Sequence, residues 1–139
     1  MATGPRQRLA AIALVVDDYD RAIDYYTKTL GFRLVEDTPQ GPTKRFVRVA
    51  PPSGSNGGDG ETTLLLAKAA NPEQTARIGD QAGGRVFLFL HTDDFERDYA
   101  AYLARGVDFT EEPRYESYGT VVVFRDLYGN KWDLVQSKT

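Results

Sequence analysis

Two residues of the chain have side chains suited to acid–base or metal chemistry, His91 and Asp133. His91 is the only histidine among the 139 residues. An imidazole titrates near neutral pH and a carboxylate can hold its proton or bind a metal, so the two could act as a general acid and base or as metal ligands. His91 could equally be a structural histidine beside Asp93. Asp133 could equally form a structural salt bridge, because an inward-facing carboxylate needs a partner.

The amino-acid counts exclude several kinds of site. The chain has no cysteine, which excludes a disulfide, a thiolate nucleophile and a cysteine-ligated zinc or iron–sulfur cluster. The single histidine also excludes any mechanism that needs two histidines within one chain. We therefore expect a cytoplasmic protein.

The charge balance and hydropathy bear on the partners of the chain. Lys and Arg number 17 against 20 Asp and Glu, which gives a net charge of −3, and nucleic-acid binding generally needs a basic face. No apolar run approaches the ~20 residues that cross a bilayer. The apolar run over residues 8–16 follows arginines, as in a signal peptide, but it is short and an Asp-rich segment follows it, which favours a β-strand. We expect neither a nucleic-acid nor a membrane partner.

The chain contains an internal repeat. The segment DDYDR at residues 17–21 and the segment DDFER at residues 93–97 share the order Asp-Asp, aromatic, acid, Arg. Each follows an apolar run typical of a buried strand and precedes apolar residues at helical spacing, so the aspartates suit helix N-caps. Gly31 and Gly106 stand where a left-handed helix cap is expected. The two apolar runs cover residues 8–16 and 85–91.

Three further strands are predicted after each helix, so each half has the order β-α-β-β-β. They cover residues 32–36, 44–50, 62–68, 107–111, 120–125 and 131–136. Since one helix covers only one face of a sheet, the other face must meet the second half, another chain or a ligand. We predict an α+β fold, one domain over residues 1–139, in which modules at about 8–68 and 85–136 form an eight-stranded, cup-shaped mixed sheet with the helices outside. A short helical connector is expected at 71–83.

This tandem order, with VVDDYDRAIDYYTKTLGF near the start and FRDLYGNKWDLVQ near the end, resembles the vicinal oxygen chelate superfamily. That superfamily contains glyoxalase I, the bleomycin-resistance proteins and the extradiol dioxygenases. The resemblance covers about residues 8–136. It implies the cup-shaped fold, a small-molecule ligand in the cup and a homodimer.

The resemblance also implies one divalent ion on the first and fourth strand of each half, usually held by His or Gln, Glu, His and Glu. The two first-strand positions are Ala11 and Phe87, whose side chains offer no lone pair. The first half has only Glu61 at the edge of its fourth strand, and the last strand has Asp133. Because metal sites generally need about three protein ligands, we expect no cofactor. A rearranged metal site, if present, would use Asp133, His91 and Glu61.

The function predicted is that of a glyoxalase- or bleomycin-resistance-like protein that binds a small organic molecule in an aromatic cup without the usual metal. An aromatic lining suits a flat or apolar ligand. Sequestration of an antibiotic is one form of this function. The alternative is a metal-dependent lyase, isomerase or dioxygenase that uses a rearranged site, so enzymatic activity stays open. The expected ligand-binding residues are Phe87, Phe89, Tyr115, Tyr118 and Arg45.

Overall fold

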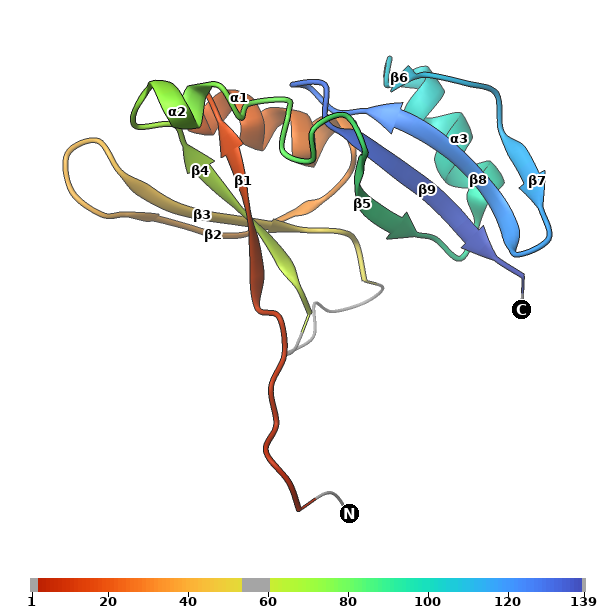
Figure 1. The fold of residues 1–139 in the computed structure, drawn as a ribbon, viewed down its shortest axis with the longest axis horizontal. Coiled ribbons are helices and arrows are strands. Elements are labelled where there is room, and N and C mark those ends of the chain that lie inside the picture. Colours follow the sequence, from red (N-terminus) through yellow and green to blue (C-terminus); the bar gives the residue numbers. More distant parts are fainter. Residues whose placement is uncertain (1–2, 54–60, 139) are drawn as a thin grey trace. The chain divides into compact units, whose positions relative to one another are not determined.

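The computed structural model describes residues 3–53 and 61–138 of the chain. The chain divides into two compact units. Unit 1 comprises Met1–Leu14 and Asp18–Lys68, and unit 2 comprises Val15–Asp17 and Ala69–Thr139. Each unit contains one β-sheet (Figure 1).

Unit 1 has a four-stranded sheet in the order β1-β4-β3-β2 and one helical segment. Asp18 caps this segment, as predicted, because its carboxylate accepts a hydrogen bond from the Arg21 amide at 2.8 Å. Gly31 follows the helix with φ 75°. The elements are β1 (Ala11–Val16), α1 (Tyr19–Asp24), the π-helix η1 (Tyr25–Thr29), β2 (Arg33–Pro39), β3 (Arg45–Ala50) and β4 (Thr63–Lys68).

Unit 2 has a five-stranded sheet in the order β5-β9-β8-β6, with β7 also paired to β8. Strand β9 runs parallel to β5 and antiparallel to β8. Asp94 caps helix α3, as predicted, through a 3.1 Å hydrogen bond from the Arg97 amide. The elements are α2 (Pro72–Thr75), β5 (Val86–His91), α3 (Phe95–Ala104), β6 (Asp108–Phe109), β7 (Arg114–Glu116), β8 (Gly119–Arg125) and β9 (Lys131–Ser137).

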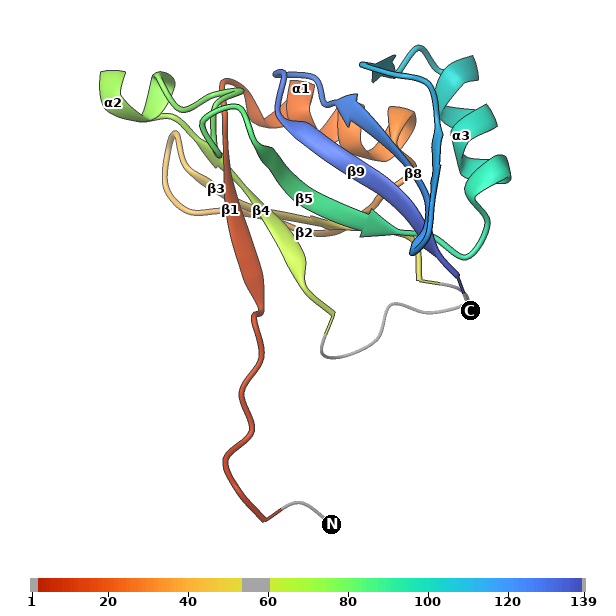
Figure 2. The same ribbon diagram turned by 45° about the vertical axis from the view of Figure 1, so that its right-hand side comes forward.

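Helix α3 packs along one face of this sheet (Figures 1 and 2). The ring of Tyr102 meets Phe124 edge-on at 5.6 Å between centroids, and Phe124 stacks on Trp132 at 5.8 Å. Such aromatic pairs add about 0.5–1.5 kcal/mol each beyond the burial of their area. Because Trp132 and Leu134 are buried on the α3 side, the alternate residues of β9 face the other way.

The turn between β8 and β9 is built around Asp126, which is 5% exposed. Its carboxylate accepts hydrogen bonds from the amides of residues 128, 129 and 130 at 3.0–3.1 Å, from Asn130 Nδ2 at 3.1 Å and from Trp132 Nε1 at 3.2 Å. Gly129 has φ 102°, as the tight turn predicted here requires. This carboxylate is therefore fully used as an acceptor.

The α+β class and the order of elements are confirmed, with the strands hydrogen-bonded into two mixed sheets. The strand predicted over residues 107–111 is shorter, and a further strand, β7, follows it. At this point the Glu111 side chain accepts a 3.0 Å hydrogen bond from the Val123 amide. A side chain thus takes the place of the backbone ladder, and Pro113 has no N–H to donate.

The connector at 71–83 was predicted as a helix, and this is wrong for most of its length. Helix α2 starts at the predicted place, where Asn71 accepts a 2.9 Å hydrogen bond from the Gln74 amide and Pro72 occupies the first turn. It ends after four residues. Gly79 and Gly83 then adopt φ values of 77° and 63°, which a right-handed helix does not accommodate.

Candidate ligand-binding site

The site is built on the face of the unit 2 sheet that is turned away from α3, called here the Asp133 face. Asp133 lies at the centre of the sheet, opposite Phe89 of β5 on one side and Val123 of β8 on the other. One pair further along, Val135 lies opposite His91 and Val121. The alternation of β9 that buries Trp132 against α3 therefore positions Asp133 on the opposite face.

Asp133 is partly buried, and its Oδ1 atom has no contact with solvent. This oxygen receives no hydrogen bond from any of the described residues. Burial raises the pKa of the carboxyl, Arg114 lowers it and Glu111 raises it further. The site thus holds a carboxylate with one inaccessible acceptor atom that the described protein donors do not satisfy.

Arg114 is the cation that lowers the pKa of Asp133, but it donates its hydrogen bonds to two other carboxylates. Its Nε donates to both oxygens of Glu111 at 3.0 and 3.1 Å, and its Nη1 donates to Glu116 at 2.6 Å. These two hydrogen bonds raise the pKa of Arg114, and the Tyr118 side chain adds to the effect. Because the guanidinium is held between two carboxylates, Asp133 obtains only a longer-range attraction from it.

Two of the predicted aromatic residues lie on β5. Phe89 is 65% exposed and directly opposite Asp133, so its ring is available to a ligand. Phe87 is half-buried at an irregularity in the pairing of β5 with β9. It lines a small cavity of ≈ 30 Å³ together with residues of the β8–β9 turn, including Gly129 and Asn130.

His91 is exposed near the end of β5, on the same sheet face as Asp133. Its Nδ1 lies 3.4 Å from the hydroxyl of Ser137. The register places His91 opposite Val135, one pair beyond Asp133, and no hydrogen bond between described residues joins the two side chains. The suggested acid–base pair stays a prediction. Asp93, the other neighbour considered for His91, forms an ion pair with Arg97 at 2.8 Å.

The two predicted tyrosines lie at the β7–β8 hairpin, and both are exposed. Tyr115 lies opposite Thr120, on the face that carries Val122 and α3. Burial is the main cause of a raised pKa of Tyr99 in α3, and Tyr115 is among the groups that add to it. Tyr115 therefore projects from the face opposite to Asp133. Tyr118 lies in the hairpin turn and interacts with Arg114, so only this tyrosine is connected to the Asp133 network.

The residues expected to join the site from unit 1 are already engaged in ion pairs there. Arg45 bonds Asp37 at 2.7 Å and Asp20 at 3.0 Å, and its guanidinium lies over the ring of Tyr19. Glu61 forms an ion pair with Arg33. The Asp37 hydrogen bond is the main cause of a raised Arg45 pKa.

The donor set does not fit the metal site that the resemblance implies. Ala11 and Phe87 have no donor atom, and Glu61 is paired with an arginine. Among the residues that the structure describes, no group of three or more His, Cys, Asp or Glu side chains is placed to hold a metal ion.

Arg114 and Glu111, which both act on the pKa of Asp133, were not predicted as site residues from the sequence. The signal was present as the run EEPRYE at residues 111–116, in which acids flank one arginine at spacings of two and three. Such spacing favours a local ion-pair network. Its relation to Asp133 depends on the β7–β8–β9 register, which the run itself does not contain.

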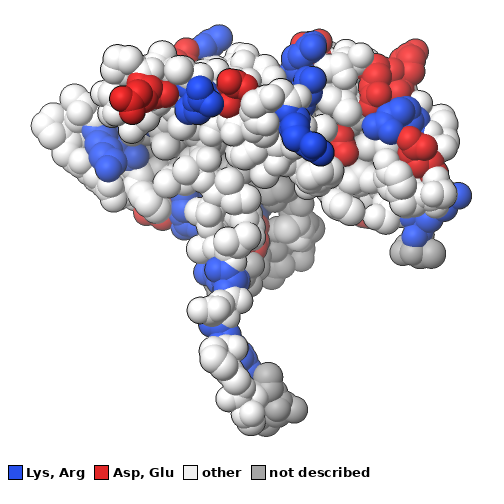
Figure 3. Space-filling view, in the orientation of Figure 1, with Lys and Arg blue, Asp and Glu red and all other residues white. Residues whose placement is uncertain are grey.

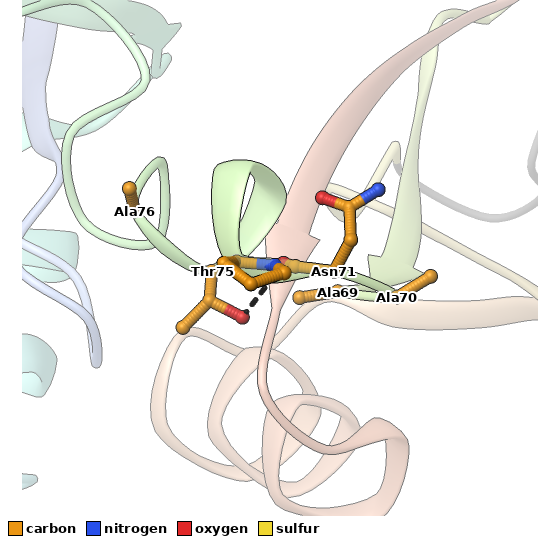
Figure 4. A pocket seen from close by; sticks show the side chains of 6 residues that line it. Ala69, Ala70, Asn71, Thr75 and Ala76 are labelled. Atoms are coloured by element: carbon orange, nitrogen blue, oxygen red, sulfur yellow. Dashed lines mark hydrogen bonds between the residues drawn. The ribbon is translucent and has the colours of Figure 1, made fainter.

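Other surface features bear on the choice of site. A hollow of ≈ 660 Å³ lies at the start of α2, lined mainly by Ala69, Ala70, Ala76 and Asn71, with the Thr75 hydroxyl bonded to the Asn71 carbonyl at 3.1 Å (Figure 4). It offers no charged group.

On the face drawn in Figure 3, basic side chains lie beside acidic ones. None of the helices within residues 3–53 and 61–138 is long and apolar enough to cross a membrane.

Comparison with known proteins identifies related chains. Residues 8–134 match the sequence profile of the Glyoxalase/Bleomycin resistance protein/Dioxygenase superfamily. An uncharacterized protein from Shewanella frigidimarina (strain NCIMB 400) is 57% identical over 132 residues, which cover 94% of each chain.

Solved structures show the same likeness. The structure of UcmS2 has a TM-score of 0.77 at 31% identity and covers 94% of this chain and 98% of its own. TnmS3, an antibiotic binding protein from Streptomyces sp. CB03234, has a TM-score of 0.73 at 30% identity and covers 96% and 98%.

Proposed function

Because the chain belongs to the Glyoxalase/Bleomycin resistance protein/Dioxygenase superfamily, we propose that it binds a small organic molecule with an aromatic or apolar body on the Asp133 face, without a metal. The observation that carries the proposal is that Asp133 and Phe89 lie opposite each other on neighbouring strands. A large ring that is 65% exposed lies directly opposite a partly buried carboxylate with an unsatisfied oxygen. Apolar surface beside a few convergent polar groups is the usual composition of a small-molecule site.

The relatives support a binding role. TnmS3 is described as an antibiotic binding protein and is 30% identical over almost the whole chain. Binding of an antibiotic or a similar natural product is therefore the form of the function that we propose here. Ala11 and Phe87 at the implied metal positions favour binding over metal-dependent catalysis.

Calorimetric titration of the protein with a panel of antibiotics and aromatic natural products tests the proposal. We expect at least one compound to bind and Phe89→Ala to weaken its binding about tenfold or more, because the contact area of the ring is lost. Tyr115→Ala is the matched control, since it also removes an exposed aromatic ring, but from the opposite face. Binding that depends on Tyr115 and not on Phe89 would contradict the placement of the site.

The metal-free part of the proposal has a separate test. The protein is incubated with Mn²⁺, Fe²⁺, Ni²⁺ and Zn²⁺, desalted and analysed for metal content by mass spectrometry. We expect no stoichiometric retention. Retention of about one metal per chain that disappears in Asp133→Ala would contradict the proposal and would support the rearranged metal site.

The homodimer implied by the resemblance stays a prediction. Light scattering at micromolar concentration measures the mass directly, against 15.5 kDa for one chain. A mass of twice this value is expected. A monomer would contradict the prediction without affecting the ligand site, which is built within unit 2.

A further inference from the structure

The Asp133 carboxylate is unusual in this protein because one of its oxygens is hidden from solvent and has no donor among the described residues. Asp126, in the turn between β8 and β9, is by contrast a buried carboxylate whose hydrogen bonds are satisfied within the protein. Its two oxygens accept five hydrogen bonds from amide and side-chain N–H groups. Asp133 is only partly buried, and its second oxygen, Oδ2, is not among the hidden atoms, so Oδ2 is the atom that a bound group can reach. Because a poorly satisfied carboxylate is costly, a bound group that donates a hydrogen bond to Oδ2 would be favoured.

The charges around Asp133 indicate what that group is. Glu111 and Glu116 hold Arg114 between them, so with Asp133 three carboxylates but one guanidinium lie in this part of the face. Further along the face, Arg125 is paired with Asp108 at 3.4 Å. An anionic ligand group would meet like charge beside Asp133, whereas an O–H or N–H donor would meet an acceptor.

The position of Phe89 defines the rest of the ligand. Phe89 and Asp133 are register partners on neighbouring strands, and such strands lie about 4.8 Å apart. A donor joined to an aromatic ring through one carbon can therefore bond the carboxylate while its ring lies against Phe89. Val123 borders Asp133 on the other side and offers apolar contact without a competing donor.

We propose that the ligand carries a hydrogen-bond donor, either ammonium or hydroxyl, next to an aromatic ring, and that Asp133 accepts this donor while Phe89 contacts the ring. This inference rests on the proposed function and names the ligand class. Asp133 is then a specificity-determining residue that occupies a position implied for a metal ligand but binds an organic donor directly.

Four probes that share one ring system test the inference. They are 1-naphthylmethylammonium, 1-naphthylmethanol, 1-(methoxymethyl)naphthalene and 1-naphthylacetate. Their affinities are measured by NMR titration, with the amide signals of Phe89 and Val123 reporting binding at the site. We expect the ammonium and the alcohol to bind about tenfold more tightly than the methyl ether and the carboxylate, because only they satisfy the Asp133 acceptor.

The variant Asp133→Asn removes the charge at almost constant volume, and we expect the preference to fall below about threefold because the amide presents donors as well as an acceptor. Asp108→Asn is the control, since it neutralises an exposed carboxylate on the same sheet, and it should keep the full preference. The comparison among probes on the unmodified protein stands whether or not Asp133→Asn folds well.

The outcomes separate this inference from the proposed function. If the methyl ether binds as tightly as the alcohol, if the carboxylate binds most tightly, or if Asp133→Asn keeps the preference, the donor inference is overturned while binding on the face stands. The same holds if the natural-product panel gives a binder but none of the naphthalene probes binds. If neither the panel nor the probes bind, the proposed function fails as well.

Discussion

Replacing Asp133 by valine should make the protein more stable while weakening the proposed binding of ligands that donate a hydrogen bond to Asp133. Asp133 is a partly buried carboxylate whose Oδ1 has no donor among the described residues. Valine has high strand propensity, and its neighbours on this face include Val123 and Phe89. The substitution removes an unsatisfied acceptor and adds apolar contact at the same position.

The size of the effect follows from these contacts. An unsatisfied buried polar group costs about 1–3 kcal/mol, and a favourable cross-strand pair contributes about 0.2–1 kcal/mol. The attraction between Asp133 and Arg114 is lost, which offsets part of the gain. We expect a net increase of about 1–2 kcal/mol in the free energy of unfolding at pH 7.

The pH dependence gives an independent check on the same variant. Burial raises the pKa of Asp133 in the folded state, so between the unfolded and folded pKa values the folded protein binds more protons. The wild-type protein therefore loses stability as pH rises through this window, and valine does not titrate. The advantage of Asp133→Val should be largest above the folded pKa and smallest below the unfolded value of about 3.9.

Urea unfolding measures this difference. Trp132 is the only tryptophan and is buried against α3, so its fluorescence reports the unfolding of unit 2. Asp108→Val is the control, because it introduces the same side chain at an exposed carboxylate. A decrease of 1 kcal/mol or more in the Asp133→Val variant would refute the reasoning, since it would mean that a favourable interaction holds Asp133 in the folded protein.

Three further substitutions test other parts of the structure. Asp126→Ala should lower the free energy of unfolding by about 3 kcal/mol in the same urea assay, because it leaves Trp132 Nε1 and the turn amides without their acceptor; a loss below about 1 kcal/mol would contradict this role. Gly119→Ala should cost about 2 kcal/mol, since Gly119 has φ 151° and a Cβ atom would lie 2.2 Å from a backbone oxygen of β9; wild-type stability would show that the strand shifts freely. The hydrogen bond from Arg45 lowers the pKa of Asp37 against the opposing effect of burial, so its stabilisation is present above the unfolded pKa and is lost as pH falls through the folded pKa. Asp37→Asn should remove at most about 1 kcal/mol at pH 7, as expected for an exposed pair, and less at pH 2; an equal loss at both pH values would exclude the charge as its cause.

The sequence was sufficient to predict the order of strands and helices in each half and the face of β9 on which Asp133 lies. The apolar runs, the capping residues Asp18 and Asp94 and the glycines after each helix are local signals, and each depends on a few adjacent residues. The alternation of side chains along β9 likewise predicted that Asp133 and Trp132 lie on opposite faces of the sheet. These predictions needed no knowledge of which strands pair.

The composition of the site could not be predicted in the same way, because it depends on register between distant segments. Pairing of β5 with β9 places Phe89, and not His91, opposite Asp133. The network of Arg114 depends on the interruption of the ladder at Glu111, where a carboxylate replaces a backbone acceptor. A single sequence shows which residues each strand contains, but it does not show which of several possible strand registers has the lowest free energy.

The strand order has a consequence for the synthesis of the protein. In unit 1, β4 is the last strand made and pairs with β1, the first. In unit 2, β9 is made last but lies between β5 and β8, so the sheet that carries the proposed ligand site lacks its central strand until β9 has left the ribosome. Since folding proceeds from the N-terminus during translation, unit 1 can close its sheet while unit 2 waits. During this interval β5 and β8 have unpaired edges, which are available for pairing with strands of other chains.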